Sequence, residues 1–190
     1  RQMCIRDSTH MIEQHYNHPS VIIWGLGNEN DWPNDFPEFD KAKIRAFMSE
    51  LHTLAHRLDA SRLTAIRRCA FCSDIVDVYS PSIWRGWYGG VFTDYKETSR
   101  KEMEKVKRFL HVEWGGDSHA GRHNEVIDGG WDTESYLKAW TKKKNEWSES
   151  YIVRLIDWHL KEQETMPWLT GTAYWPFKDF STPCLLYTSP

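Results

Sequence analysis

The segment from His18 to Asn30, HPSVIIWGLGNEN, constrains the fold of this chain more than any other. Its apolar run at residues 21–24 is broken by two glycines and then followed by Asn28 and Glu29. An apolar run of this length, bounded by turn residues, is typical of a strand that is buried on both faces in a parallel sheet. The segment therefore predicts a buried strand with a carboxylate at its carboxyl end, where barrel enzymes hold their catalytic residues.

Strand patterns alternate with helix patterns along the rest of the chain. Further strands are predicted to start at residues 63, 75, 109 and 169. A helix is predicted after the first strand, because apolar residues from Ile44 to Leu58 recur every three or four positions. Asp35, with Glu38 three residues later, is expected to cap that helix. Helical stretches near 97–107 and 135–164 separate the later strands, so the order predicts a parallel α/β fold.

The number of strands decides which α/β fold is expected. Five strands in 190 residues are too few for a closed eight-stranded barrel, which typically needs ~250 residues. The chain is therefore expected to be the C-terminal half of a (β/α)8 barrel, incomplete at both ends and, with its unpaired edges, poorly soluble or inactive alone. An open doubly wound sheet is the alternative, but no Gly-x-Gly-x-x-Gly turn follows a strand.

Composition limits the partners of the chain. With 40% hydrophobic residues and a net charge of −3, the chain can form one globular core and does not favour a nucleic-acid partner. No run of about eighteen apolar residues predicts a membrane span. Eleven tryptophans are unusual. Most are expected to pack in the core, whereas those after strand-like runs could form flat platforms for sugar rings.

The two ends of the chain differ from the segments beside them. Residues 1–8, RQMCIRDS, and 184–190, CLLYTSP, resemble translated adaptor sequence, so both are expected to be non-native tails. Residues 9–183 are then a partial catalytic domain. Any export signal would precede it, so the choice between bacterial periplasm and cytoplasm stays open.

Two pairs of residues could suggest a metal site. Cys69 and Cys72 form a lone Cys-x-x-Cys, which is a weak sign of zinc or redox chemistry, and ordinary buried thiols are the expectation. His119 and His123 could bind a metal if they lay on a helix, but no third ligand follows at a suitable spacing. Surface histidines are expected there. The sequence therefore predicts no metal and no other cofactor.

A second carboxylate follows a second strand-like run, since residues 109–112 lead directly into Glu113. Hydrolysis of a glycosidic bond needs one carboxylic acid to protonate the leaving oxygen and one carboxylate to attack or stabilise the anomeric carbon. In retaining enzymes the two groups lie ~5 Å apart, so that mutual repulsion keeps a proton on one of them. Alone, Glu29 or Glu113 could be an ordinary loop carboxylate, but together they predict glycoside hydrolysis.

Three segments carry a family resemblance. HPSVIIWGLGNEN, FLHVEWGG and GTAYWPFKDF resemble the acid/base, nucleophile and eighth-strand motifs of glycoside hydrolase family 2, which contains β-galactosidases, β-glucuronidases and β-mannosidases. The resemblance covers roughly residues 10–183 and implies about strands four to eight of the barrel. It also implies that Glu29 is the general acid/base and Glu113 the nucleophile. By the same resemblance, Asn28 bonds the sugar 2-hydroxyl and Trp175 forms a wall of the sugar pocket.

One part of the chain departs from the family pattern. Members often place a tyrosine near the end of the sixth strand, where it can bond the nucleophile, but Ser82-Ile83-Trp84 stands here. An indole can only donate a hydrogen bond. Either Trp84 shapes the pocket differently or Tyr88 replaces the tyrosine, so both are candidate substrate-binding residues.

The resemblance implies a retaining exo-β-glycosidase that acts on terminal non-reducing sugars of oligosaccharides or glycans, and a β-galactosidase is the leading expectation. A β-glucuronidase or β-mannosidase is the alternative within the family. An alternative of another class is a catalytically silent carbohydrate-binding barrel that uses its tryptophans as platforms. The oligomeric state cannot be predicted.

Overall fold

The computed structural model describes residues 2–118, 121, 123, 148–176 and 178. The chain divides into two compact units. Unit 1 consists of Arg1–Ser82 with Met103–Leu110, and unit 2 consists of Ile83–Glu102 with His111–Pro190.

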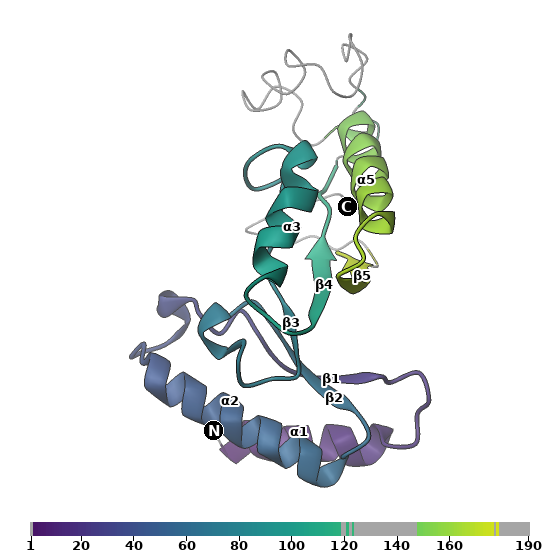
Figure 1. The fold of residues 1–190 in the computed structure, drawn as a ribbon. Helices are drawn as coiled ribbons and strands as arrows, with labels where there is room; N and C mark the ends of the chain where they lie inside the picture. The colour runs from purple at the N-terminus through teal and green to yellow at the C-terminus, as the bar shows by residue number, and fades with distance from the viewer. Residues whose placement is uncertain (1, 119–120, 122, 124–147, 177, 179–190) are drawn as a thin grey trace. The chain divides into compact units, whose positions relative to one another are not determined.

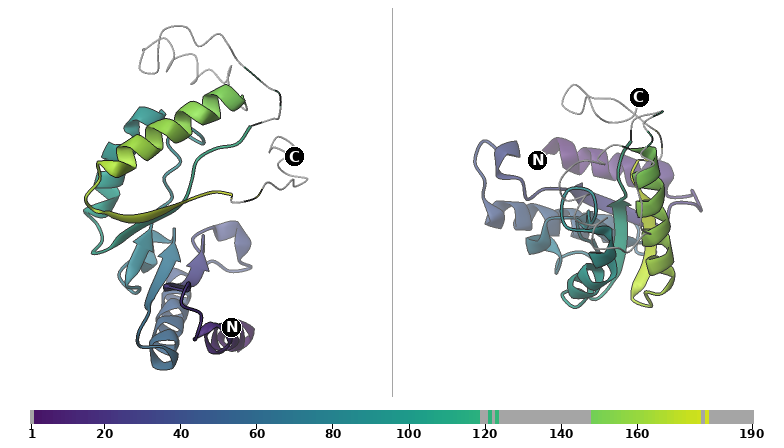
Figure 2. Two further views of the ribbon diagram at one scale, coloured as in Figure 1. Left: turned by 90° about the vertical axis from the view of Figure 1, so that its right-hand side faces the viewer. Right: turned by 90° about the horizontal axis from the view of Figure 1, so that it is seen from above.

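Unit 1 combines two helices with three parallel strands. The helices are α1 (Gln2–His15) and α2 (Lys41–Leu58), and the strands are β1 (Ile23–Asn28), β2 (Leu63–Arg67) and β3 (Val78–Ser80), with short 3-10 turns η1 (Pro33–Asp35) and η2 (Ala70–Cys72). β1 pairs with β2 and β2 with β3, all in parallel, with one irregularity between Gly25 and Gly27. Figures 1 and 2 show α1 and α2 side by side along the strands.

The core of unit 1 forms where α2 packs on the sheet. Ile44, Met48 and Leu51 of α2 are buried in one cluster with Ile66 of β2 and Tyr79 of β3. This face is the one that the apolar spacing predicts, so that prediction is confirmed. A second cluster joins α1, β1 and α2 through Ile12, Trp24 and Ala55 respectively.

Helix α2 begins later than the sequence predicts. Its N-cap is Asp40, whose carboxylate accepts hydrogen bonds from the backbone nitrogens of residues 42 (2.9 Å) and 43 (3.1 Å). Asp35 instead ends the turn η1, and Glu38 accepts a hydrogen bond from Lys43 Nζ at 3.1 Å. The prediction of Asp35 as the cap was wrong, because the chain between Asp35 and Asp40 does not yet form the helix. The Asp40 side chain, by contrast, can reach the free backbone amides of the first turn of α2.

Unit 2 contains most of the second half of the described chain. Its elements are η3 (Phe92–Asp94), α3 (Tyr95–Met103) except its last residue, β4 (Phe109–Trp114) from His111 onward, α5 (Glu149–Glu164) and β5 (Leu169–Tyr174). Its core joins η3 to α5 through Phe92, Tyr151, Ile152 and Leu155, and Ser148 caps α5 by accepting a hydrogen bond from the Tyr151 nitrogen at 3.2 Å. Figures 1 and 2 show β4 between α3 and α5.

The strand order is β1-β2-β3-β4-β5. The pairs β1–β2, β2–β3 and β3–β4 are parallel, the last of them through Tyr79 and Phe109. The predicted five strands and the parallel α/β arrangement are therefore confirmed for the pairs from β1 to β4, although β3 starts at Val78 rather than at residue 75. No helix in the described residues is long and apolar enough to cross a membrane.

Several expectations concern the ends and the undescribed part. Residues 2–8, expected to be a non-native tail, lie within α1, whereas 184–190 are outside the described residues. The assignment of both tails stays a prediction. The predicted helix from about residue 135 is described only from Glu149 onward.

Candidate active site

Glu29 follows the last residue of β1 and has a left-handed backbone, with φ 54°. Its nitrogen donates a hydrogen bond to the Arg67 carbonyl oxygen at 3.1 Å, so the turn is fixed to the end of β2. A left-handed conformation costs a residue other than glycine ~1–2 kcal/mol. Such conformations persist where surrounding contacts hold them and are enriched at active sites.

Two arginines at the carboxyl end of β2 contact the Glu29 carboxylate. The side chain of Arg67 is only 6% exposed, and its Nη1 donates a hydrogen bond to Glu29 Oε1. The same Nη1 lies 3.4 Å from Asn28 Oδ1, and Nη2 donates to Ser82 Oγ at 3.1 Å. Arg68 Nη1 lies 3.4 Å from Glu29 Oε1. The end of β2 therefore fixes the orientation of both Asn28 and Glu29.

The loop after Glu29 closes on the other carboxylate oxygen. Trp32 Nε1 donates a hydrogen bond to Glu29 Oε2 at 2.9 Å. The guanidinium of Arg68 stacks over the Trp32 ring, with its carbon 3.9 Å from the ring centroid, and its Nε lies 3.2 Å from Asp31 Oδ2. Both oxygens of Glu29 thus have partners in unit 1.

These contacts set the protonation of Glu29 within unit 1. Burial is the largest single influence and raises its pKa, but it is outweighed by the hydrogen bonds from Arg67 and Trp32 and by the charges of both arginines. The net result is a pKa below the ordinary value for glutamate. In unit 1 alone, Glu29 is therefore ionised at neutral pH.

Glu113 occupies the corresponding position near the carboxyl end of β4. It too has a left-handed backbone, with φ 65°. The next residue, Trp114, is buried, and its carbonyl oxygen accepts a hydrogen bond from the Trp175 nitrogen at 3.0 Å. Trp175 therefore lies beside the end of β4, with 45% of its surface exposed.

Two glycines follow this strand and allow close packing around it. A Cβ on Gly115, where φ is 125°, would lie 2.1 Å from Tyr174 Cε2. A Cβ on Gly116 would lie 2.7 Å from Ile152 Cδ1, and the Gly116 carbonyl oxygen accepts a hydrogen bond from the Tyr174 hydroxyl at 2.6 Å. The segment after Glu113 therefore requires residues without side chains.

Left-handed backbone conformations at residues other than glycine are confined to the ends of strands in the described residues. Four described residues other than glycine have a positive φ: Glu29, Arg68, Cys69 and Glu113. Each lies at or just beyond the carboxyl end of its own strand, β1, β2 or β4, and in barrel enzymes the carboxyl ends of the strands carry the catalytic residues. Two of them are the glutamates that the sequence predicts to be catalytic.

Trp84 and Tyr88 belong to an aromatic loop of unit 2. Their rings meet edge to face, with centroids 5.2 Å apart and planes at 69°, and the ring of Trp87 lies 6.3 Å from that of Tyr88. Tyr88 is 71% exposed. The predicted site residues thus form two groups: Asn28 and Glu29 in unit 1, and the other four in unit 2.

The structure adds two residues that sequence reasoning missed, Arg67 and Arg68. The signal was present, because both arginines directly follow the apolar part of a predicted strand, at the same edge as Glu29. Two adjacent cations are unusual at the end of a buried strand unless they neutralise carboxylates there.

The other side chains considered for metal binding have simpler roles. Cys69 and Cys72 are fully buried, and burial raises the pKa of both thiols, which agrees with their interpretation as buried thiols. His123 Nδ1 lies 3.3 Å from a carboxylate oxygen of Glu149. His119 lies outside the described residues.

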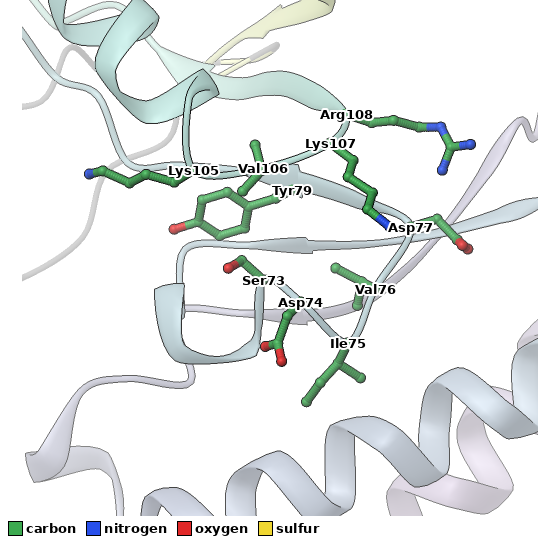
Figure 3. Close-up of a pocket in the computed structure, with 10 residues that line it drawn as sticks. All are labelled: Ser73, Asp74, Ile75, Val76, Asp77, Tyr79, Lys105, Val106, Lys107 and Arg108. Atoms are coloured by element: carbon green, nitrogen blue, oxygen red, sulfur yellow. The ribbon is translucent and has the colours of Figure 1, made fainter.

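A cavity of about 420 Å³ in unit 1 lies away from this site. It is lined by residues 73–77, Tyr79 and 105–108, which precede or begin β3 and β4 (Figure 3). The cavity is thus at the amino ends of the strands. Because chemistry in barrels takes place at the carboxyl ends, it is not the candidate active site.

Comparison with known proteins shows what the chain is similar to. A sequence model described as glycosyl hydrolases family 2, TIM barrel domain, matches residues 1–184. Solved structures of Parabacteroides merdae β-glucuronidase (70% identity, TM-score 0.85) and Bacteroides uniformis β-glucuronidase 3 (62%, TM-score 0.87) each match 96% of this chain. A curated relative from Formosa agariphila is 46% identical in an alignment of 186 residues that covers 92% of this chain.

The chain spans only a small part of these relatives. It covers 22% of the Parabacteroides chain, 23% of the Bacteroides chain and 23% of the Formosa protein. The family match, in contrast, extends over nearly all of the 190 residues and agrees with the parallel α/β sheet. This chain therefore belongs to glycosyl hydrolase family 2, as a fragment of the TIM barrel domain.

Proposed function

We propose that this chain carries the catalytic residues of a retaining exo-β-glucuronidase. The observation that carries the proposal is the pair Glu29 and Glu113, each left-handed at the carboxyl end of a parallel strand in a family 2 chain. The names of the two solved relatives at 62% and 70% identity support glucuronide as the substrate class. These names favour a β-glucuronidase, which was an alternative within the family, over a β-galactosidase, which was the leading expectation from the sequence.

In this mechanism the two glutamates act in two steps. Glu113 attacks the anomeric carbon while Glu29 gives a proton to the departing glycosidic oxygen, which forms a covalent glycosyl-enzyme and releases the aglycone. Glu29, now ionised, takes a proton from water, whose oxygen attacks the anomeric carbon and frees Glu113. Two inversions retain the β configuration. This chemistry requires the carboxylates to lie ~5 Å apart in the complete enzyme.

The contacts of Glu29 fit one half of this cycle directly. Ionised Glu29, held by Arg67 and Trp32, is ready to act as the general base of the second step. The first step requires a proton on Glu29, so its pKa must rise in the complete site. A second carboxylate within ~5 Å has that effect, and so does the negative charge of a bound glucuronide.

The remaining candidates are assigned to substrate binding. Asn28 offers both a donor and an acceptor to the sugar 2-hydroxyl, and its Oδ1 lies 3.4 Å from Arg67 Nη1, which fixes the amide. Trp175, exposed beside the end of β4, offers a flat face to a sugar ring. Trp84 and Tyr88 line the pocket near Glu113 in this proposal, where Tyr88 takes the place of the family's sixth-strand tyrosine.

A chimera tests the proposal in a complete enzyme. Residues 9–183 would replace the matching segment of the Parabacteroides merdae β-glucuronidase, which is 70% identical. Initial rates would be measured on nitrophenyl β-glucuronide, β-galactoside and β-mannoside. We expect glucuronide to be the preferred substrate, and Glu29→Gln and Glu113→Gln each to lower kcat at least ~10³-fold.

Matched controls separate chemistry from folding. Glu38→Gln changes an exposed glutamate of unit 1, and Glu164→Gln changes an exposed one of unit 2, so both should retain full activity. Preference for galactoside would contradict the assigned substrate class. If the folded chimera bound sugar but hydrolysed none of the glycosides, the carbohydrate-binding alternative would replace the proposal.

A further inference from the structure

Three side chains of unit 1 that the active site does not use converge near the amino ends of β2 and β3. His52 and His56 lie one turn apart on α2, so they project from the same face of the helix. Asp77 immediately precedes β3. Each of the three offers one atom that can bind a metal ion, and these three atoms all lie within 4.8 Å of one another. Within the described residues, this is the one group of three such side chains close enough to hold a metal ion.

Thr64, the second residue of β2, organises this group. Its backbone nitrogen and its hydroxyl donate hydrogen bonds to Asp77 Oδ2 at 2.9 and 3.1 Å. Because a hydroxyl has a single hydrogen, the Thr64 oxygen then accepts from His52 Nδ1, which lies 2.8 Å away. That contact fixes the orientation of the His52 ring. Histidines that bind metals are commonly oriented by such a bond to the second ring nitrogen.

We propose that His52, His56 and Asp77 bind a divalent transition-metal ion of the zinc class. Two imidazoles and one carboxylate form a recurrent zinc ligand set, and water completes the coordination. His56 Nε2 lies 2.7 Å from Asp77 Oδ2. In a tetrahedral site with ligand bonds of ~2.0–2.1 Å, two ligand atoms lie ~3.3–3.4 Å apart, so these atoms must separate by roughly 0.6–0.7 Å, which rotation of two partly exposed side chains can supply.

The ion has a route to this site. The side chains of His56 and Asp77 are 32% and 22% exposed. Asp77 also lines the cavity of about 420 Å³, where Figure 3 shows its carboxylate at one side. An ion can therefore reach the carboxylate from solvent.

The position of the site indicates its role. Thr64 is near the amino end of β2, whereas Arg67, which contacts Glu29, is at the carboxyl end of the same strand. At ~3.3 Å per residue, three residues separate the two ends by ~10 Å. The ion would thus not touch the proposed chemistry. The ion would join α2 to the start of β3. It would stabilise the folded state because it binds the folded chain and not the unfolded chain.

The experiment compares metal binding in folded variants of the chimera. After chelation and dialysis, Zn²⁺ would be titrated by calorimetry, and Co²⁺ would be followed by its visible absorption, which reports nitrogen and oxygen ligands. Because the rest of the chimera can bind metal as well, the measured quantity is the difference between variants. We expect His52→Gln and His56→Gln each to bind one equivalent fewer than the unchanged chimera and to lose part of the Co²⁺ absorption.

His10→Gln, which changes an exposed histidine on α1, is the matched control and should retain full binding. Zn²⁺ should raise the thermal midpoint of the chimera more than that of either variant, with glucuronidase activity unchanged by the metal. Equal stoichiometry and equal Co²⁺ spectra in all four proteins would overturn the proposal. If either His52→Gln or His56→Gln failed to fold, the other would still test the proposal, because each variant removes one proposed ligand by itself.

Discussion

The buried guanidinium of Arg67, at the end of β2, donates a hydrogen bond to the carboxylate of Glu29, just beyond the end of the neighbouring strand β1. The cation thus lies against the group proposed to act as general acid and base. A cation in this position stabilises the ionised carboxylate and lowers its pKa. The acid strength of Glu29 is therefore set in part by a residue from the adjacent strand.

Replacing Arg67 should change the pH dependence of the chimera. The first chemical step needs protonated Glu29, so kcat/KM falls as pH rises through the pKa of Glu29 in the free enzyme. Because Arg67 lowers this pKa, Arg67→Met should raise it and move the alkaline limb of the profile to higher pH. Maximal activity should fall as well, since the carboxylate loses its orientation.

Two further variants make this result specific. Arg67→Lys keeps a positive charge and should move the limb less than Arg67→Met does. Arg57→Met removes an exposed arginine of α2 and should leave the profile unchanged. An alkaline limb that stays in place or moves to lower pH in Arg67→Met would show that Arg67 does not control Glu29.

Gly115→Ala should destabilise the barrel at the end of β4. The new Cβ would lie 2.1 Å from Tyr174 Cε2, on a backbone with φ 125° that side chains rarely adopt. We expect a loss of ~1–3 kcal/mol, visible as a lower midpoint of thermal inactivation of the chimera. Gly89→Ala is the control, because no atom lies within 4 Å of the added Cβ. Equal midpoints for the two variants would refute the packing described for Gly115.

Asp59 should make the stability of unit 1 sensitive to acid. It is fully buried and accepts hydrogen bonds from Trp24 Nε1 at 3.0 Å and Arg62 Nη1 at 2.7 Å. Burial raises its pKa, but these and other hydrogen bonds outweigh burial and hold the pKa far below the ordinary value. The ionised group therefore contributes stability that is complete above the unfolded pKa of ~3.9 and is lost as pH falls toward the folded pKa.

The test of Asp59 uses Asp59→Asn in the chimera. At neutral pH this variant leaves Arg62 without its buried carboxylate and should lose ~3 kcal/mol or more. The difference in thermal midpoint between variant and unchanged chimera should shrink as pH is lowered below about 4. A constant difference over the whole pH range would mean that Asp59 does not titrate with unfolding.

Much of the fold could be predicted because hydrophobic spacing reports directly on burial. The five strands and the inward face of α2, with Ile44 and Met48, follow from apolar periodicity alone. The start of α2 could not be predicted as reliably. Both Asp35 and Asp40 are suitable caps, and the choice depends on where the preceding loop ends. Loop paths depend on tertiary contacts that no local pattern records.

The two glutamates of the candidate site could be predicted because each lies at the end of a strand-like segment: Glu29 follows the apolar run at 21–24 after a short glycine-containing stretch, and Glu113 directly follows residues 109–112. Their left-handed backbones could not, since only the contacts around each turn hold such a conformation in place. Arg67 was missed because its partner, Glu29, is 38 residues away and the two meet only when β1 pairs with β2. The cluster of His52, His56 and Asp77 depends in the same way on packing of α2 against β2 and β3.

The central claim is that Glu113 is the nucleophile of a retaining glucuronidase, and trapping the glycosyl-enzyme tests it most directly. The chimera would be incubated with an activated 2-deoxy-2-fluoro-β-glucuronide, digested and mapped by mass spectrometry. We predict one label, on Glu113, with inactivation in proportion to labelling and no label in Glu113→Gln. A label on Glu29 or on any other residue, or turnover without a trapped intermediate, would contradict the account.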